Sequence, residues 1–190
     1  MKTVTVTRTL YTLAELRDLA DDPDSNITHD AYERAHSWVL EGNTDYEWWD
    51  SIEWDLSEIG LNLDSFDIDR RSIQLSKVVG CWWNVARKVL TNHGKDAQTY
   101  RIVRDYIRLA VDARRTWYDA LPPDERATTD RSEWESTDDA KTLLADFVND
   151  LGEEYLSLLQ QELDYRTSEE AVFETAEANE YHFTLDGHPA

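Results

Sequence analysis

The fold is decided by residues 44–69, which read TDYEWWDSIEWDLSEIGLNLDSFDID. The first half of this stretch spaces apolar residues three and four apart, as on one face of a helix: Trp49, Ile52, Leu56 and Ile59. Gly60 predicts the end of that helix, because glycine adopts the left-handed backbone of a helix C-cap at little cost. From residue 61 the apolar spacing drops to two, which predicts a half-buried strand. We therefore expect a mixed α+β fold.

The rest of the chain favours helices, because Gly and Pro number only six and four among 190 residues. Capping residues and apolar spacing predict about six to seven helices, over 12–20, 28–42, 44–59, 78–92, 96–121, 137–165 and 169–178. Thr12 with Glu15 and Thr44 with Glu47 are predicted capping boxes, and Thr167 or Ser168 is the predicted cap of the last helix. The two longest should pair antiparallel and bury their apolar stripes. Alternation predicts strands of a small antiparallel sheet over 3–10, 61–69, 72–77 and 181–185. The polar stretch 123–137 should be a mobile connection anchored by Trp134.

The length predicts a single domain over residues 1–190. We expect a mixed strand and helix part over 1–77, a helical part over 78–180 and a terminal strand or tail over 181–190. No apolar run approaches the roughly 20 residues of a membrane span, and the first residues do not resemble a signal peptide. With a single cysteine, a disulfide framework is not expected. These features predict a cytoplasmic protein.

The net charge of −21 is the dominant feature of the composition. Residues 1–69 carry 17 acidic and four basic side chains, residues 70–118 carry three and 11, and residues 119–190 carry 20 and four. We expect the basic middle to pack against the acidic flanks. Direct binding of nucleic acid is not expected, because phosphate contacts need clustered, exposed Lys and Arg. The acid excess fits salt adaptation of the host, mimicry of nucleic-acid phosphates, or solvation, and composition does not separate these explanations.

The candidate partner-binding site is an acidic and aromatic surface within residues 44–58. Its members are Glu47, Trp48, Asp50, Glu53, Trp54 and Asp55. Trp49 belongs to the apolar stripe, whereas Trp48 and Trp54 do not and are expected to face outward. An exposed Trp supplies large apolar area at protein interfaces, and the acids would favour a partner with a basic surface. The alternative is that neighbouring elements cover both rings.

Two groups of side chains have a spacing that could hold a metal ion. His29, Glu33 and His36 fall at i, i+4 and i+7 of a predicted helix, which could present three ligands to zinc. Asp67 and Asp69 lie on one side of a predicted strand and could hold Mg²⁺. Both patterns are also typical of ordinary polar faces, and we expect no metal.

Cys81 lies in an apolar run and is expected to be a small buried residue rather than a reactive thiol. No phosphate-binding loop, nucleophile elbow, His-Glu-x-x-His or Cys-x-x-Cys motif is present. We therefore expect neither a cofactor nor enzyme activity. A metal-dependent enzyme using Asp67 and Asp69 remains the less favoured alternative.

Short segments spread over nearly the whole chain follow the pattern of one group of proteins. They are residues 11–16, 48–50, 58–61, 66–70, 92–94, 167–171, 178–181 and 183–184. On these segments the chain resembles small acidic accessory proteins of bacteriophages and other mobile elements, some of which are described as antitoxins of toxin–antitoxin stability systems. The loop at residues 22–25 departs from the shorter connection expected for the group.

The resemblance implies an accessory protein that acts inside a bacterial cell, where such proteins often inhibit host defence. Together with the acidity, it predicts a non-catalytic inhibitor of bacterial defence, most concretely an anti-CRISPR protein bound to a basic surface of a CRISPR effector subunit. The alternative is an antitoxin or other regulator that sequesters a toxin partner. No membrane partner is expected, and the target and the stoichiometry remain open.

Overall fold

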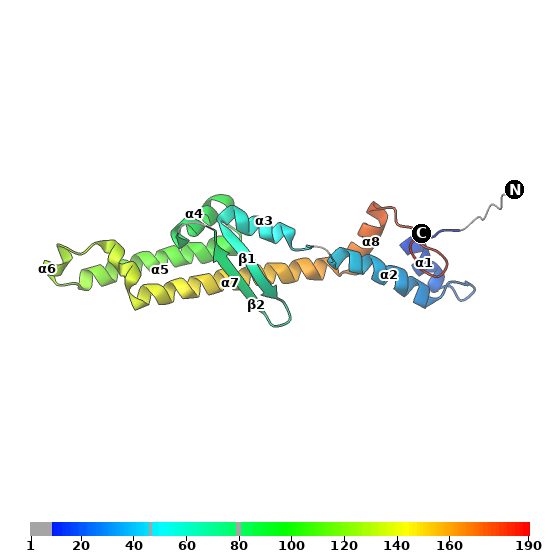
Figure 1. The fold of residues 1–190 in the computed structure, drawn as a ribbon, viewed down its shortest axis with the longest axis horizontal. Helices are drawn as coiled ribbons and strands as arrows, with labels where there is room; N and C mark the ends of the chain where they lie inside the picture. The colour runs from blue at the N-terminus through cyan, green and yellow to red at the C-terminus, as the bar shows by residue number, and fades with distance from the viewer. Residues whose placement is uncertain (1–8, 46, 79–80) are drawn as a thin grey trace. The chain divides into compact units, whose positions relative to one another are not determined.

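The structure is a computed structural model that describes residues 9–45, 47–78 and 81–190 (Figure 1). These residues are mainly helical and include one two-stranded antiparallel sheet, which confirms the α+β class. The chain divides into two compact units, unit 1 with residues 1–49 and 161–190 and unit 2 with residues 50–160. These boundaries do not coincide with the divisions expected at residues 77 and 180.

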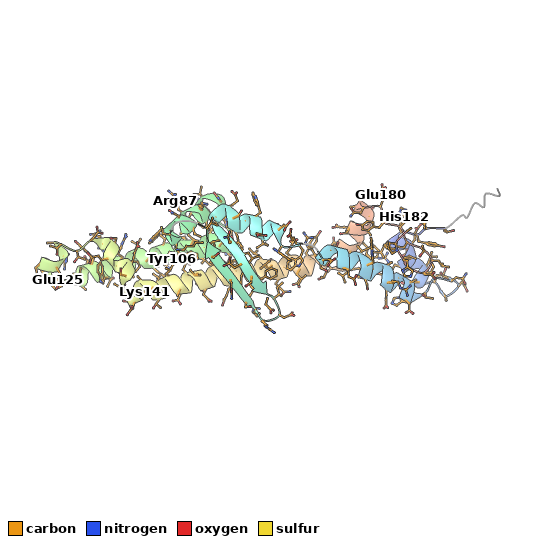
Figure 2. All side chains as sticks on the ribbon, in the orientation of Figure 1. Arg87, Tyr106, Glu125, Lys141, Glu180 and His182 are labelled. Carbon is orange, nitrogen blue, oxygen red and sulfur yellow. The ribbon has the colours of Figure 1, made fainter. Side chains whose placement is uncertain are left out.

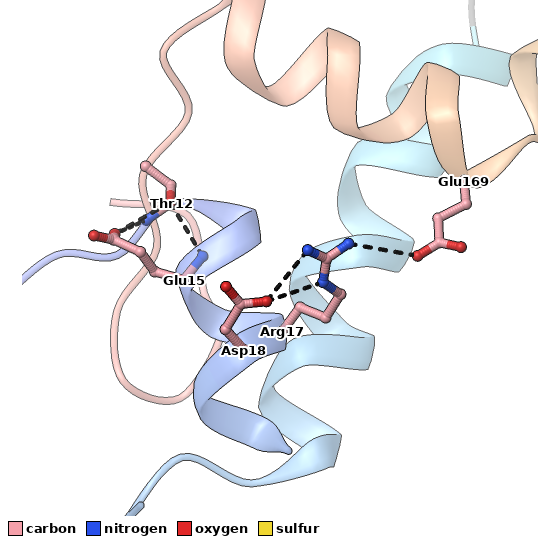
Figure 3. A network of polar contacts seen from close by, with 5 residues as sticks. All are labelled: Thr12, Glu15, Arg17, Asp18 and Glu169. Atoms are coloured by element: carbon pink, nitrogen blue, oxygen red, sulfur yellow. Dashed lines mark hydrogen bonds and ion pairs between the residues drawn. The ribbon is translucent and has the colours of Figure 1, made fainter. Parts of the chain in front are cut away.

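Unit 1 is built from α1 (Leu13–Ala20), α2 (His29–Thr44), the last residues of α7 (Asp138–Arg166) and α8 (Glu169–Ala178). Its buried core joins α1, α2, α8 and the C-terminal segment, with the members Leu13, Leu16, Ile27, Ala31, Ala35, Val39, Val172, Ala176 and Phe183. The predicted capping box at the start of α1 is present, because Thr12 and Glu15 exchange hydrogen bonds (Figure 3). Arg17 contacts Asp18 and Glu169, which links α1 to α8 (Figure 3).

The C-terminal segment of unit 1 is held by single bridges rather than by a strand. The fully buried Phe183 forms antiparallel bridges with Tyr11 and with Pro189. The predicted strand over 181–185 is therefore wrong, and the sheet contains only two strands among the described residues. The predicted strand over 3–10 falls largely on residues 1–8, outside the described residues.

Unit 2 contains α3 (Asp50–Ile59), β1 (Leu61–Asp67), β2 (Ser72–Lys77), α4 (Trp82–Asn92), α5 (Gln98–Ala120) and most of α7. Its core draws fully buried residues from most of these elements, among them Leu56, Ile59, Leu61, Val85, Val89, Val103, Leu151 and Tyr155. As predicted, α5 and α7 run antiparallel and side by side (Figure 1). The rings of Tyr106 (labelled in Figure 2) and Phe147 stack at 4.2 Å between centroids and join the two helices.

The β1–β2 hairpin packs on α7 at the glycine that interrupts the apolar stripe of that helix. A Cβ atom at Gly152 would lie 3.2 Å from Cγ2 of Ile73, closer than ordinary van der Waals contact. Glycine lowers helix stability by about 1 kcal/mol relative to alanine, so its presence is explained by the close approach of the strand. The hairpin turn uses a left-handed residue, Arg71, with φ of 50°.

The structure corrects several predicted boundaries. Thr44 does not cap a helix but ends α2, and its hydroxyl donates to the carbonyl of Leu40. The following helix begins at residue 50 rather than 44, and α4 begins at residue 82 rather than 78. The stretch 123–137 contains α6 (Pro123–Arg126) and the 3₁₀ helix η1 (Arg131–Ser136), with Trp134 buried as predicted. These two short helices raise the helix count of the described residues above the predicted six to seven.

Candidate functional site

One face of α3 combines a large exposed aromatic ring with carboxylates. Trp54 is 67% exposed, the largest value among the exposed large apolar residues that the structure describes. Asp50 and Glu58 lie one turn before and one turn after it, and Glu53 precedes it; all three are exposed. The helix contains no Lys or Arg. We call Asp50, Glu53, Trp54 and Glu58 the α3 face.

Of the six residues predicted from the sequence, the α3 face retains Asp50, Glu53 and Trp54. Glu47 is exposed but precedes the helix and belongs to unit 1, so it is not part of this face. Trp48 is only 7% exposed and meets the ring of Trp49 edge-on, so the expectation that it faces outward is wrong. The physical reason is that α3 starts after both tryptophans, and helical periodicity therefore does not govern which of them is covered.

Asp55 does not project freely into solvent, because it joins three other elements of unit 2. Its Oδ2 accepts a 2.7 Å hydrogen bond from the hydroxyl of Tyr155 on α7. Its Oδ1 lies 3.5 Å from Nε2 of His93, which follows α4, and Nδ1 of His93 is 2.7 Å from the hydroxyl of Thr99 on α5. Burial, reinforced by the hydrogen bond to Asp55, raises the pKa of Tyr155 far above the ordinary value for tyrosine. This network has a structural role that the sequence did not indicate.

The candidate zinc ligands on α2 form an ordinary polar surface. Nε2 of His29 is 3.5 Å from Glu33, and both side chains are exposed. His36 instead contacts the ring of Tyr32. Within the part of the chain that the structure describes, no group of three or more His, Cys, Asp or Glu side chains could hold a metal ion.

Of the two candidate magnesium ligands, Asp67 stabilises the hairpin. Asp67 accepts a 2.9 Å hydrogen bond from the backbone N–H of Arg70 and lies 3.6 Å from its guanidinium. Asp69 is exposed in the turn. Cys81 was predicted to be buried and is instead exposed, because it occupies the N-cap position before α4 rather than the helix interior.

The basic middle of the sequence forms an exposed stripe on α5. Arg101, Arg104, Arg108 and Arg115 follow one another at three, four and seven residues and are all exposed. The ion pairs within this stripe are local, since Arg104 and Arg108 both approach Asp105. We therefore find no support for the expectation that these side chains are neutralised by packing against the acidic flanks.

The acid excess is unevenly divided between the units. Unit 1 carries 18 acidic and five basic residues, and unit 2 carries 22 and 14. Unit 1 also contains a groove that sequence reasoning missed, between the start of α1 and the end of α8. No periodic pattern marks this groove, because its walls come from residues about 160 positions apart in the chain.

Comparisons of the chain with protein-family models, with curated proteins and with solved structures found no match. Among the described residues, no helix has the length and apolar character needed to cross a membrane.

Proposed function

We propose that this protein is a non-catalytic, acidic inhibitor of bacterial defence that binds a basic, nucleic-acid-binding protein surface. The most concrete target is a subunit of a CRISPR effector complex, in keeping with the resemblance to accessory proteins of phages and mobile elements. The observation that carries the proposal is the exposure of Trp54 among the carboxylates of the α3 face. The alternative is an antitoxin that sequesters a toxin partner. The experiment described below distinguishes the two functions by the partner that is recovered.

The physical support comes from what each kind of side chain contributes to an interface. A Trp ring buries a large area at small entropic cost and is enriched among residues that dominate binding energy. Carboxylates around it attract a basic partner over a distance of about 10 Å and fix its orientation. The α3 face therefore offers one apolar anchor inside a field of negative charge, which suits a surface rich in Lys and Arg.

The test is co-purification of the tagged full chain from a host with active CRISPR and restriction systems, followed by measurement of the affinity for the recovered protein. We expect a CRISPR effector subunit, and an affinity about 30-fold weaker for the variant with Trp54→Ala and Glu53→Lys. A matched control in the same unit is Leu109→Ala with Asp112→Lys, since Leu109 is also exposed. Trp48→Ala is unsuitable, because Trp48 is buried and its loss would perturb the fold.

Three outcomes would contradict the proposal. Recovery of a small toxin would favour the antitoxin alternative. Recovery of an effector subunit that binds the Trp54 variant as tightly as the wild-type chain would move the interface away from α3. Recovery of no partner would leave the acidity to be explained by solvation or salt adaptation.

A further inference from the structure

The groove in unit 1 has an apolar floor and a volume of about 480 Å³. We call the apolar part of its lining the floor, which consists of Leu13 and Ala14 from the first turn of α1, Phe173 and Ala176 from α8, and Tyr181. A cavity of this size accepts a few side chains rather than a single methyl group. The groove therefore has room for at least one large apolar side chain.

The polar part of the lining, which we call the rim, carries two acids. Its members are Thr12, Glu177, Glu180 and His182, and the lining contains no Lys or Arg. Both glutamates are exposed, and neither carboxylate forms a hydrogen bond or an ion pair with any residue that the structure describes. The guanidinium of Arg17 lies 4.7 Å from the Phe173 ring centre, but it pairs with Asp18 and Glu169. Two carboxylates beside an apolar floor are complementary to a basic side chain next to an apolar one.

Glu180 has a backbone conformation that its side chain disfavours. Its φ is 52°, and it follows the C-cap residue of α8 in a Schellman arrangement. In that arrangement the backbone N–H of Glu180 donates to the backbone carbonyl of Glu177, and the N–H of Tyr181 donates to the backbone carbonyl of Ala176. Glycine or asparagine is preferred at this position. A carboxylate there also lies at the negative end of the helix dipole, which is a second local penalty.

No interaction within the described residues compensates for these two penalties. The link between Nδ1 of His182 and the carbonyl of Glu180, at 2.7 Å, uses the backbone alone and would be retained by any residue at that position (both are labelled in Figure 2). Residues that break a local rule without a structural gain are expected where function requires them. The position of Glu180 on the groove rim therefore points to recognition of a cation.

We propose that this groove is a second docking site, which binds a short segment of a partner protein that places a large apolar side chain on the floor and an adjacent Lys or Arg against Glu177 and Glu180. The site is independent of the α3 face, and its occupant need not be the partner bound there. Because the contacting groups are few, recognition should depend on the two carboxylates and on the apolar anchor together.

The first experiment selects peptides from a displayed library of random 12-residue sequences on the immobilised full chain. We expect enrichment of sequences with an aromatic or large aliphatic residue beside Lys or Arg. A labelled peptide of this kind should bind about tenfold more weakly to the variant Glu177→Lys with Glu180→Lys. The matched control is Asp24→Lys with Glu170→Lys, two exposed acids of the same unit outside the groove, which should leave the affinity unchanged.

The second experiment uses Glu180→Gly, which removes the carboxylate and relieves the backbone at once. We expect the midpoint of thermal unfolding to rise by about 2–4 °C while the affinity for the selected peptide falls. A gain in stability together with a loss of binding excludes unfolding as the cause of the loss. Unchanged peptide affinity in this variant would show that Glu180 does not recognise the cation and would overturn its proposed role.

Other outcomes overturn the docking site as a whole. These are enrichment of no peptide, enrichment of acidic peptides, or equal binding by the wild-type chain and the double charge reversal. If peptides bind only after Val4→Asp and Val6→Asp, the occupant is the first segment of the chain itself rather than a partner. Trp54→Ala should leave peptide binding intact, so failure of this proposal and failure of the proposed function are separate results.

Discussion

Gly187 shows how a single residue fixes the C-terminal segment of unit 1. Its φ is 76°, and a Cβ atom placed on it would lie 1.9 Å from the carbonyl oxygen of Ala31 on α2. The guanidinium of Arg34 also donates to the carbonyl of Asp186, next to this contact. The first contact meets a backbone atom of α2, and the second meets a backbone atom of the C-terminal segment. Both therefore need the segment to approach α2 closely.

We predict that Gly187→Ala lowers the free energy of unfolding by about 3 kcal/mol, because the left-handed backbone and the overlap with Ala31 add together. Gly42→Ala is the control, since a Cβ atom there meets nothing within 4 Å. It lies inside α2 and should instead stabilise the chain by about 0.5–1 kcal/mol through helix propensity. Urea unfolding measures both, and similar effects of the two alanines would contradict the geometry.

At the scale of elements, Asp55 connects α3 to α7 through the hydroxyl of Tyr155. Tyr155 is fully buried, and its pKa is raised first by burial and then by Asp55. A raised pKa means that the folded state holds the phenol proton more tightly than the unfolded state does. The resulting stabilisation is complete below the ordinary pKa of about 10 and is lost as the pH rises above it.

We predict that Tyr155→Phe lowers the free energy of unfolding by about 1–2 kcal/mol at pH 7, because a hydrogen bond to a charged acceptor is removed. Between about pH 9 and 11 the wild-type chain should lose stability faster than the variant, so that the difference shrinks. Unfolding in urea at several pH values measures this. If the free energies of unfolding of the wild-type chain and of the variant fell in parallel with pH, the pKa of Tyr155 would not be higher in the folded chain than in the unfolded chain.

At the scale of the whole molecule, the charge of −21 should oppose folding through self-repulsion. Unit 1 carries most of the imbalance, with 18 acidic and five basic residues. Several acids do have local partners, such as Asp18 with Arg17 and Glu162 with Arg166. Among the residues that the structure describes, such pairs are few compared with the number of carboxylates, so net repulsion should dominate.

We predict that the midpoint of thermal unfolding at pH 7 rises by several degrees between about 0.02 M and 0.5 M NaCl, because salt screens repulsion between exposed carboxylates. Circular dichroism at constant protein concentration measures it. A midpoint that stays constant or falls would mean that attractive pairs outweigh repulsion. Binding through the α3 face should respond in the opposite direction and weaken with salt.

The sequence alone determined most of the secondary structure, since the signals involved are local. The capping box of Thr12 and Glu15 is a four-residue pattern, and the start of α1 was predicted from it. A cap at Thr167 or Ser168 likewise predicted α8, and the structure shows that Ser168 is the cap. The change of period at Gly60 marked the passage from α3 to β1. Local hydrogen bonding and side-chain period specify these features without help from distant residues.

Only the tertiary structure decided which aromatic and charged side chains are buried and which are exposed to solvent. Trp48 and Trp54 have similar local sequences, yet one is buried and the other exposed, because burial depends on where α3 begins and on what packs around it. One partner of Asp55, Tyr155, is 100 residues away on α7, and the groove beside Glu180 joins the start of α1 to the end of α8. Such juxtapositions follow from chain topology, which periodicity does not encode.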